Sequence, residues 1–148
     1  MDVPAEILSK LEHFCAYQER CEADVRKKLV SLPISVAQRD EVVRRLKEND
    51  FINDERFTEC FIRGKMRENQ WGRVKIKQGL YAKGVDAQIV SEKMAEIDED
   101  EYSQLLLDVI DKWKRQNKSD ADNRSKLIRA MLNKGFEVDN IMKAITNQ

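Results

Sequence analysis

The sequence contains few residues that break helices. Glycine and proline together number only 7 in 148 residues, well below the roughly 12% of average usage. Leucine, lysine, glutamate, arginine and alanine are frequent, and these residues favour helices. No segment alternates apolar and polar residues for long enough to predict a β-strand. The composition therefore predicts an all-α protein.

Cysteine is also scarce, and no long apolar run is present. The three cysteines, Cys15, Cys21 and Cys60, are odd in number and far apart, so they do not indicate a disulfide framework. No apolar run approaches the ~18 residues of a membrane span. The first six residues are acidic and lack the apolar core of a signal peptide. We therefore expect a protein of the reducing cytoplasm.

The residues that usually build a catalytic centre are missing or isolated. His13 is the only histidine, and it has no partner at the spacing of a metal site. Residues 79–84 lack the spacing of a phosphate-binding loop. The acidic run at 98–101 precedes a predicted helix, where it complements the helix dipole. We expect no enzyme activity, no metal and no cofactor.

Three stretches repeat at an interval of 51 residues. In each stretch two apolar residues four positions apart precede a helix breaker, and another apolar residue follows it directly, as at the end of an amphipathic helix. The matching sets are Val25, Ile76 and Leu127; Leu29, Leu80 and Met131; Pro33, Gly84 and Gly135; and Ile34, Val85 and Phe136. A longer helix is expected before each pair of short ones. Such repeats predict three tandem three-helix units, at 1–53, 54–97 and 98–148, in an elongated, curved array.

Charge is uneven along this chain, although 27 basic residues balance 27 acidic ones. Residues 63–83 carry seven basic residues and one acidic residue, whereas residues 84–111 carry one basic and nine acidic residues. Residues 112–134 carry eight basic and two acidic residues. Basic groups beside an aromatic ring can bind a nucleic-acid backbone or an acidic protein surface. A solvated face of a highly charged helical protein would show the same pattern.

The candidate partner-binding residues come from these two basic blocks. Those in the first block surround Trp71 and those in the second surround Trp113, although we expect each tryptophan to pack between helices. The candidates are Arg63, Arg67, Arg73, Lys75 and Lys77, and then Lys112, Lys114, Arg115 and Arg124. The prediction is that Arg73 and Lys77 flank the buried side of their helix and can be replaced without loss of the fold.

Two motifs in the middle unit resemble the central signature of the RecX family of recombinase regulators. They are the stretch from Phe51 to Phe57, FINDERF, with Phe61 and Ile62 after it, and the stretch from Trp71 to Lys77, WGRVKIK, continuing to Leu80, Lys83, Gly84 and Val85. Residues 21–29 are similar to the family's opening stretch, and the third unit matches it loosely through Leu127, Leu132 and residues 134–136. The resemblance covers nearly the whole chain.

The signature residues themselves have a structural interpretation. We expect Asp54 to cap the helix that follows it and Phe57 to close the apolar entry to that helix. We expect Gly72 to allow a turn between two helices and Gly84 to provide a left-handed stop. Ile76 and Leu80 are predicted to be buried.

The resemblance implies a non-enzymatic regulator, expected to be a monomer. Members of the family bind RecA recombinase and its filament on single-stranded DNA, lie in the filament groove and typically inhibit ATPase and strand exchange; weak DNA binding is a further possible activity. Two other classes stay open. A direct nucleic-acid binder fits the helix-turn-helix character of each unit, although the pI of about 6.6 counts against it. The other open class is a generic helical adaptor for protein interactions.

Overall fold

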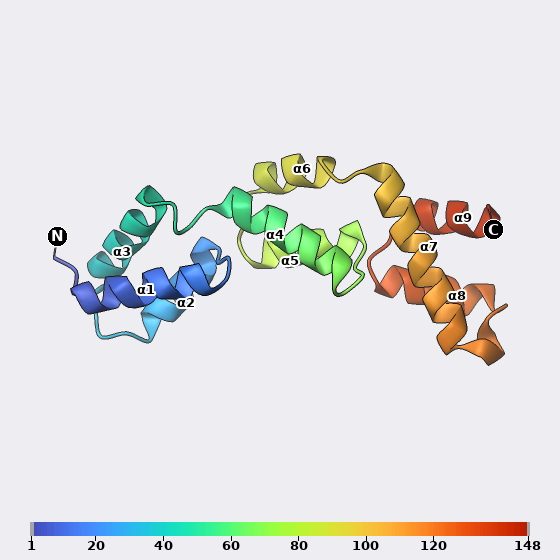
Figure 1. Cartoon of the computed structure of the whole chain (residues 1–148), viewed down its shortest axis with the longest axis horizontal. Helices are drawn as coiled ribbons and strands as arrows, with labels where there is room; N and C mark the ends of the chain where they lie inside the picture. The colour runs from blue at the N-terminus through green and yellow to red at the C-terminus, as the bar shows by residue number, and fades with distance from the viewer. Residues whose placement is uncertain (1, 148) are drawn as a thin grey trace.

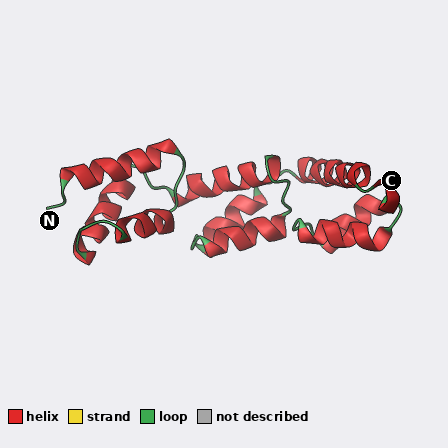
Figure 2. Cartoon of the chain, turned by 90° about the horizontal axis from the view of Figure 1, so that it is seen from below, coloured by secondary structure: helices red, strands yellow, loops and turns green. Residues whose placement is uncertain are grey.

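Three helical units follow one another in a gently arched row, with the two ends of the chain at opposite ends of the row (Figure 1). The computed structural model describes residues 2–147, which form nine α-helices, a short 3-10 helix and no strand (Figure 2). The first unit contains α1 (Ala5–Tyr17), α2 (Glu22–Val30) and α3 (Val36–Glu48); the second contains α4 (Asp54–Arg67), α5 (Arg73–Ala82) and α6 (Ala87–Ala95); the third contains α7 (Glu99–Gln116), the 3-10 helix η1 (Lys118–Asp120), α8 (Arg124–Asn133) and α9 (Val138–Thr146). The predicted all-α repeat architecture is confirmed.

Short polar side chains begin many of these helices by accepting hydrogen bonds from free backbone N–H groups. Ser35 caps α3, and its side chain accepts a bond from the Gln38 N–H in a capping box. The cap of α4 is Asn53, whose Oδ1 accepts from the Arg56 N–H at 2.9 Å. The prediction that Asp54 caps this helix is therefore wrong by one position. Asp54 is the first helical residue.

The 51-residue repeat reappears as a repeated helix ending. Gly84 and Gly135 have φ angles of 76° and 96°. The second helices of the middle and last units, α5 and α8, are therefore each followed by a left-handed residue. The predicted stop at Gly84 is confirmed. In the first unit the equivalent position is Pro33, which cannot adopt this conformation.

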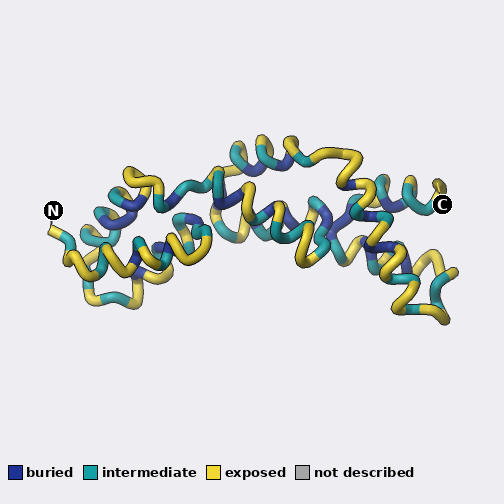
Figure 3. The backbone as a smooth tube through the Cα atoms, viewed as in Figure 1, coloured by how far each residue is buried: buried dark blue, intermediate teal, exposed yellow. Residues whose placement is uncertain are grey.

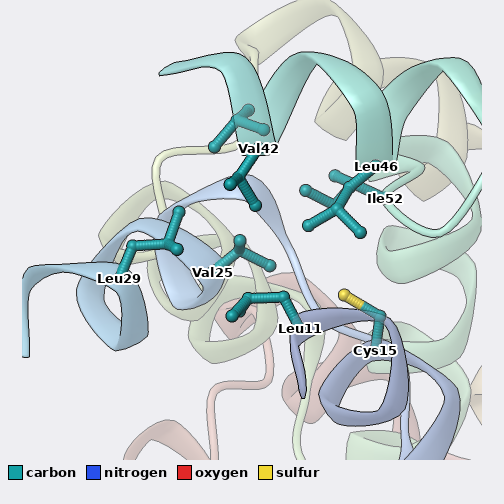
Figure 4. Close-up of a cluster of buried hydrophobic side chains, with 8 residues drawn as sticks. Leu11, Cys15, Val25, Leu29, Val42, Leu46 and Ile52 are labelled. Atoms are coloured by element: carbon teal, nitrogen blue, oxygen red, sulfur yellow. The ribbon is translucent and has the colours of Figure 1, made fainter. Parts of the chain in front are cut away.

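Each unit surrounds its own small apolar core. Buried stretches lie along the inner sides of each helix triplet, and the outer turns are exposed (Figure 3). In the first unit, α1 contributes Leu11 and Cys15, α2 contributes Val25 and Leu29, α3 contributes Val42 and Leu46, and Ile52 completes the cluster (Figure 4). The second core contains Phe57, Ile76 and Leu80, as predicted. The division of the chain at 53/54 and 97/98 remains a prediction, because Cys21 packs in the second core and Met66 and Ile97 contact both later cores.

The first and second units meet where α2 begins. The Cys21 thiol donates to the Lys83 carbonyl at 3.7 Å, and the Lys83 ammonium pairs with Asp24 at 2.8 Å. Burial raises the pKa of the Cys21 thiol to about 11, so it stays a protonated donor. Asp54 receives the Glu22 N–H at 3.3 Å, which ties α2 to the start of α4.

The second and third units meet at the equivalent place, where α5 begins. The Gly72 N–H donates to the Lys134 carbonyl at 2.8 Å, and the Val74 N–H donates to the Gly135 carbonyl at 2.9 Å. A Cβ at Gly72 would lie 2.4 Å from the Gly135 backbone. Gly72 has an extended φ of −80°, so the prediction that it is needed for a turn is wrong. This glycine permits two backbones to approach closely.

Arg73 fastens the same joint through its side chain. Its guanidinium pairs with Glu99 at 2.6 Å and with Glu137 at 2.7 Å, and it lies 3.9 Å from the centre of the Tyr102 ring. The Tyr102 hydroxyl donates to Glu137 and accepts the Arg73 N–H. Burial and the hydrogen bond to Glu137 raise the Tyr102 pKa. Arg73 therefore takes part in the joint between the units, and its replacement without loss of the fold stays a prediction.

Replacing Leu80 tests the buried face of α5. Leu80 is fully buried, so Leu80→Ala should lower the free energy of unfolding by roughly 2–5 kcal/mol. Val74→Ala on the same helix is the control, because Val74 is exposed and should change stability by less than about 0.5 kcal/mol. The measurement is chemical denaturation; equal stability of both variants would contradict the assignment of this face.

A double-mutant cycle tests the joint between the second and third units. Arg73→Gln should cost about 1.5–3 kcal/mol of unfolding free energy, because Glu137 loses a charged hydrogen-bond partner. Glu137→Gln should have a smaller effect once Arg73 has been replaced, since contacting residues are not additive. Lys77→Gln, at an exposed position of α5, is the control. Strict additivity of the two replacements would show that the joint does not depend on this pair.

Candidate functional site

The basic residues of the middle unit lie on different sides of it. Arg63 and Arg67 are exposed on α4 and line a cleft of about 460 Å³ between α4, α6 and the start of α7. Glu96, Asp98 and Glu101 line the same cleft, and its apolar residues include Met66 and Leu105. The lining of this cleft is therefore partly apolar and carries both cationic and acidic groups.

Lys75 belongs to a different surface from Arg63 and Arg67. Its ammonium lies 4.9 Å from the centre of the Trp71 ring and 3.5 Å from the Asn133 carbonyl, to which it donates. Lys77 is exposed on α5, and Arg73 is held in the joint described above. The five candidates of the first basic block thus do not form one continuous face.

The second basic block is divided as well, and one of its members reaches the middle unit. The Lys112 ammonium on α7 donates to Gln70 Oε1 at 3.4 Å. Lys114 is half-buried, whereas Arg115 and Arg124 are exposed. Among the four candidates of the second block, Lys112 therefore contacts the loop between α4 and α5.

Two lysines that the sequence analysis missed lie beside the same loop. The Lys65 ammonium on α4 is 4.7 Å from the centre of the Trp71 ring and 5.4 Å from that of Phe61. The Lys134 ammonium, at the end of α8, donates to the Asn69 carbonyl at 3.3 Å. No spacing rule connects these lysines, because they come from different helices; the only signal in the sequence is their place in the two basic blocks.

We use the name lysine cluster for four residues that converge on the loop at residues 68–72. They come from α4, α5, α7 and the end of α8, and they are Lys65, Lys75, Lys112 and Lys134. Trp71 is half-buried and packs against Phe61, with the ring planes at 70°. The expected packing of Trp71 between helices is thus observed, and the ring also faces two ammonium groups.

A second cleft lies next to the lysine cluster, between the first and second units. Its volume is about 470 Å³, and it is lined by Lys27, Lys65, Lys83, Phe61, Trp71 and Gly79, among others. A Cβ at Gly79 would lie 2.8 Å from the Phe61 ring, so glycine leaves room for this aromatic wall. Asp24 also lines the cleft but is paired with Lys83.

Two further statements hold for residues 2–147, the part of the chain that the structure describes. No three His, Cys, Asp or Glu side chains come together in a way that could hold a metal ion. No helix combines the length and the apolar character needed to cross a membrane.

Comparisons with known proteins agree with these features of the fold. Residues 53–94 match the family model described as RecX, second three-helix domain. Regulatory protein RecX of Lactococcus lactis subsp. lactis is 32% identical over 129 residues, which cover 84% of this chain and 48% of that protein. Regulatory protein RecX of Clostridium perfringens strain 13 is 31% identical over 135 residues, or 86% of this chain and 63% of that protein. The chain thus spans about half to two thirds of the length of these relatives.

Solved structures extend the likeness to the whole array. The crystal structure of RecX from Lactobacillus salivarius has a TM-score of 0.80 and 26% identity, and the match covers 97% of both chains. Another crystal structure of regulatory protein RecX matches with a TM-score of 0.84 over 97% of this chain and 71% of the other; at 19% identity, it supports the fold alone. The family model, the relatives and the shared three-unit architecture agree, and together they support the assignment of this chain to the RecX family of regulatory proteins.

Proposed function

We propose that this chain binds RecA recombinase and its filament on single-stranded DNA, and that it inhibits the ATPase and strand-exchange activities of the filament. The observation that carries the proposal is the match to a RecX crystal structure over 97% of both chains. A row of three units presents an extended surface, as repeat proteins generally do. Such a surface suits the groove of a helical filament.

The charges of the described residues support binding to a large charged assembly. Arg63 and Arg67 belong to residues 63–83, which carry seven basic residues and one acidic residue, whereas residues 84–111 carry one basic and nine acidic residues. This separation of charge in a neutral chain gives a directional field, which can orient the protein as it approaches a partner. The partner-facing residues in this proposal are Arg63, Arg67, Lys75, Lys77, Lys112, Lys114, Arg115 and Arg124. Arg73 acts within the joint between units.

The proposed mode of action is binding alone. The regulator acts as a monomer in the cytoplasm and occupies a surface that the recombinase needs for strand exchange, without a catalytic step of its own. Purified chain that hydrolyses ATP in the absence of RecA, with activity lost on a point substitution, would contradict this part of the proposal.

Charge reversal in the cleft beside α4 tests the proposal. Arg63→Glu combined with Arg67→Glu should weaken binding to RecA filaments by about tenfold or more, because both groups are exposed and would now repel acidic surface. The measurement is a titration of RecA filaments on single-stranded DNA, followed by anisotropy of a labelled chain. RecA ATPase activity is recorded in parallel.

The matched control has the same change in net charge at a distance from the cleft. Lys10→Glu combined with Lys143→Glu alters exposed positions on α1 and α9. Circular dichroism verifies that both variants are folded. Equal affinities of wild type and both variants would remove the cleft from the binding surface, and failure of the wild-type chain to bind filaments would overturn the proposed function.

A further inference from the structure

The second and third units are held together by apolar side chains that both cores share and by backbone hydrogen bonds. Met66 and Ile97 pack against the second core and against the third. The Gly72 and Val74 N–H groups donate to backbone carbonyls of the third unit at 2.8 and 2.9 Å. Arg73 adds two ion pairs and is only 18% exposed. These two units therefore form one body.

The joint between the first and second units contains fewer contacts of this kind. Among residues 2–147, Cys21 is the only apolar side chain that the first unit contributes to the second core, and no apolar residue packs against both of these cores. In the same part of the chain, no backbone-to-backbone hydrogen bond connects α1, α2 or α3 to α4, α5 or α6. The remaining contacts of this joint come from polar side chains.

These polar side chains are partly exposed to water. Arg56 on α4 pairs with Glu19, which follows α1, and Lys83 pairs with Asp24 at 2.8 Å. In each pair the basic side chain is about 40% exposed and the acidic one just over 20%. The contact from the Cys21 thiol to the Lys83 carbonyl is long, at 3.7 Å. Ion pairs that water reaches contribute little to stability and weaken with salt, so this joint is the weaker of the two.

The chain between the first and second units passes through one residue that can act as a pivot. Ile52 is buried in the first core, and α4 begins directly after Asn53, so Asn53 lies between two firmly held segments (Figure 1). Asp50 and Arg56 form an ion pair three residues to either side of Asn53, and a contact so close to the pivot does not have to break. In the linker between the other two units, Ile97 is held by both cores. Hinges are usually such residues at the end of an element.

We propose that Asn53 is a hinge about which the first unit moves as one body, while the second and third units stay together as another. The contacts around Cys21 hold the hinge closed, and it opens when they are lost. Movement at this point changes the curvature of the row, which lets the chain adapt to extended surfaces of different curvature. The hinge is a property of the chain without a partner, so it stands or falls independently of the proposed binding to RecA.

The three native cysteines report different events in the full chain. Cys60 is exposed, Cys15 lies in the first core, and Cys21 is covered by the second core. Alkylation by iodoacetamide is followed at each cysteine by mass spectrometry. Opening of the hinge exposes Cys21 but leaves Cys15 covered, so Cys21 should react at least about tenfold faster than Cys15 and more slowly than Cys60. Equal rates at Cys15 and Cys21 would show that the first unit must unfold before the joint opens, and would overturn the inference.

Hydrogen exchange distinguishes the hinge from fraying of α2. The Val25 N–H donates to the Cys21 carbonyl at 3.3 Å in the first turn of this helix. A hinge exposes the Cys21 thiol while this bond stays intact, so the Val25 amide should be protected at least about tenfold more than the thiol. Equal protection of the two groups would assign the exposure of Cys21 to fraying and would contradict the hinge.

Removing one ion pair tests what holds the joint closed. Lys83→Gln removes the pair with Asp24 and keeps the backbone carbonyl that Cys21 contacts. It should speed the alkylation of Cys21 about two- to fivefold, as expected for a partly exposed ion pair. Lys126→Gln is the matched control, because it removes a partly exposed pair within the third unit. Equal rates in the two variants would contradict the role assigned to the pair of Lys83 and Asp24.

Distances between the units test the movement directly by fluorescence energy transfer. One dye is attached to Cys60 on α4, and the other to Lys10→Cys on α1 or, as the control, to Lys143→Cys on α9; all three positions are exposed. The distances from the first to the second unit should be broadly distributed and should shift as salt is raised to about 1 M, where the Debye length is about 3 Å. The distances from the second to the third unit should stay narrow and unchanged. Two distributions of equal width that do not respond to salt would overturn the inference.

Discussion

The structure depends on one kind of contact that occurs twice. The residue before α2 contacts the end of α5, and the residue before α5 contacts the end of α8. Cys21 contacts the Lys83 carbonyl, and Gly72 contacts the Lys134 carbonyl. Gly72 lies 51 residues after Cys21, and Lys134 lies 51 residues after Lys83. The sequence repeat therefore determines the joints as well as the helices. Units this small bury little surface alone, and the repeated contact aligns three cores in one row.

The two joints use different chemistry at equivalent positions. The first depends on a thiol hydrogen bond and on the pair of Asp24 and Lys83, whereas the second depends on backbone contacts and on Arg73. At the second joint, glycine is required because a side chain at Gly72 would overlap the neighbouring backbone. At the first joint the Cys21 thiol makes the contact to the Lys83 carbonyl, and its distance of 3.7 Å is longer than the 2.8 Å from the Gly72 nitrogen to the Lys134 carbonyl at the second joint. The repeats therefore differ in the residues that form the joints, although the joints lie at equivalent positions.

The joints also decide which charged residues are available to a partner. Arg73 belongs to a basic block, yet its guanidinium is occupied by Glu99 and Glu137 from the third unit. Lys134 and Lys112, which also belong to the third unit, are brought to the loop at residues 68–72. One contact between units therefore removes an arginine from the surface and adds two lysines to a cluster. Both effects arise where the second unit meets the third.

Much of the local structure could be predicted from the sequence. Apolar residues at helical spacing identified buried positions such as Ile76 and Leu80, and glycine at position 84 identified the left-handed stop. Helix capping was predicted one residue late, at Asp54 instead of Asn53, because both side chains can accept the same kind of bond. These features depend on neighbours within about four residues along the chain, and such neighbours are visible in a sequence.

The sequence by itself determined the helices, their repeat and the buried face of each helix, since periodicity and chain breakers act locally. Only the tertiary structure decided which basic groups share a surface. Arg63 and Arg67 turned toward α6 and α7, while Lys65, from the same helix, turned toward Trp71. Lys134 reached that surface through a hydrogen bond to Asn69, which is 65 residues away in the chain. The physical reason is that a helix shows several faces, and the packing of neighbouring units decides which of them meet.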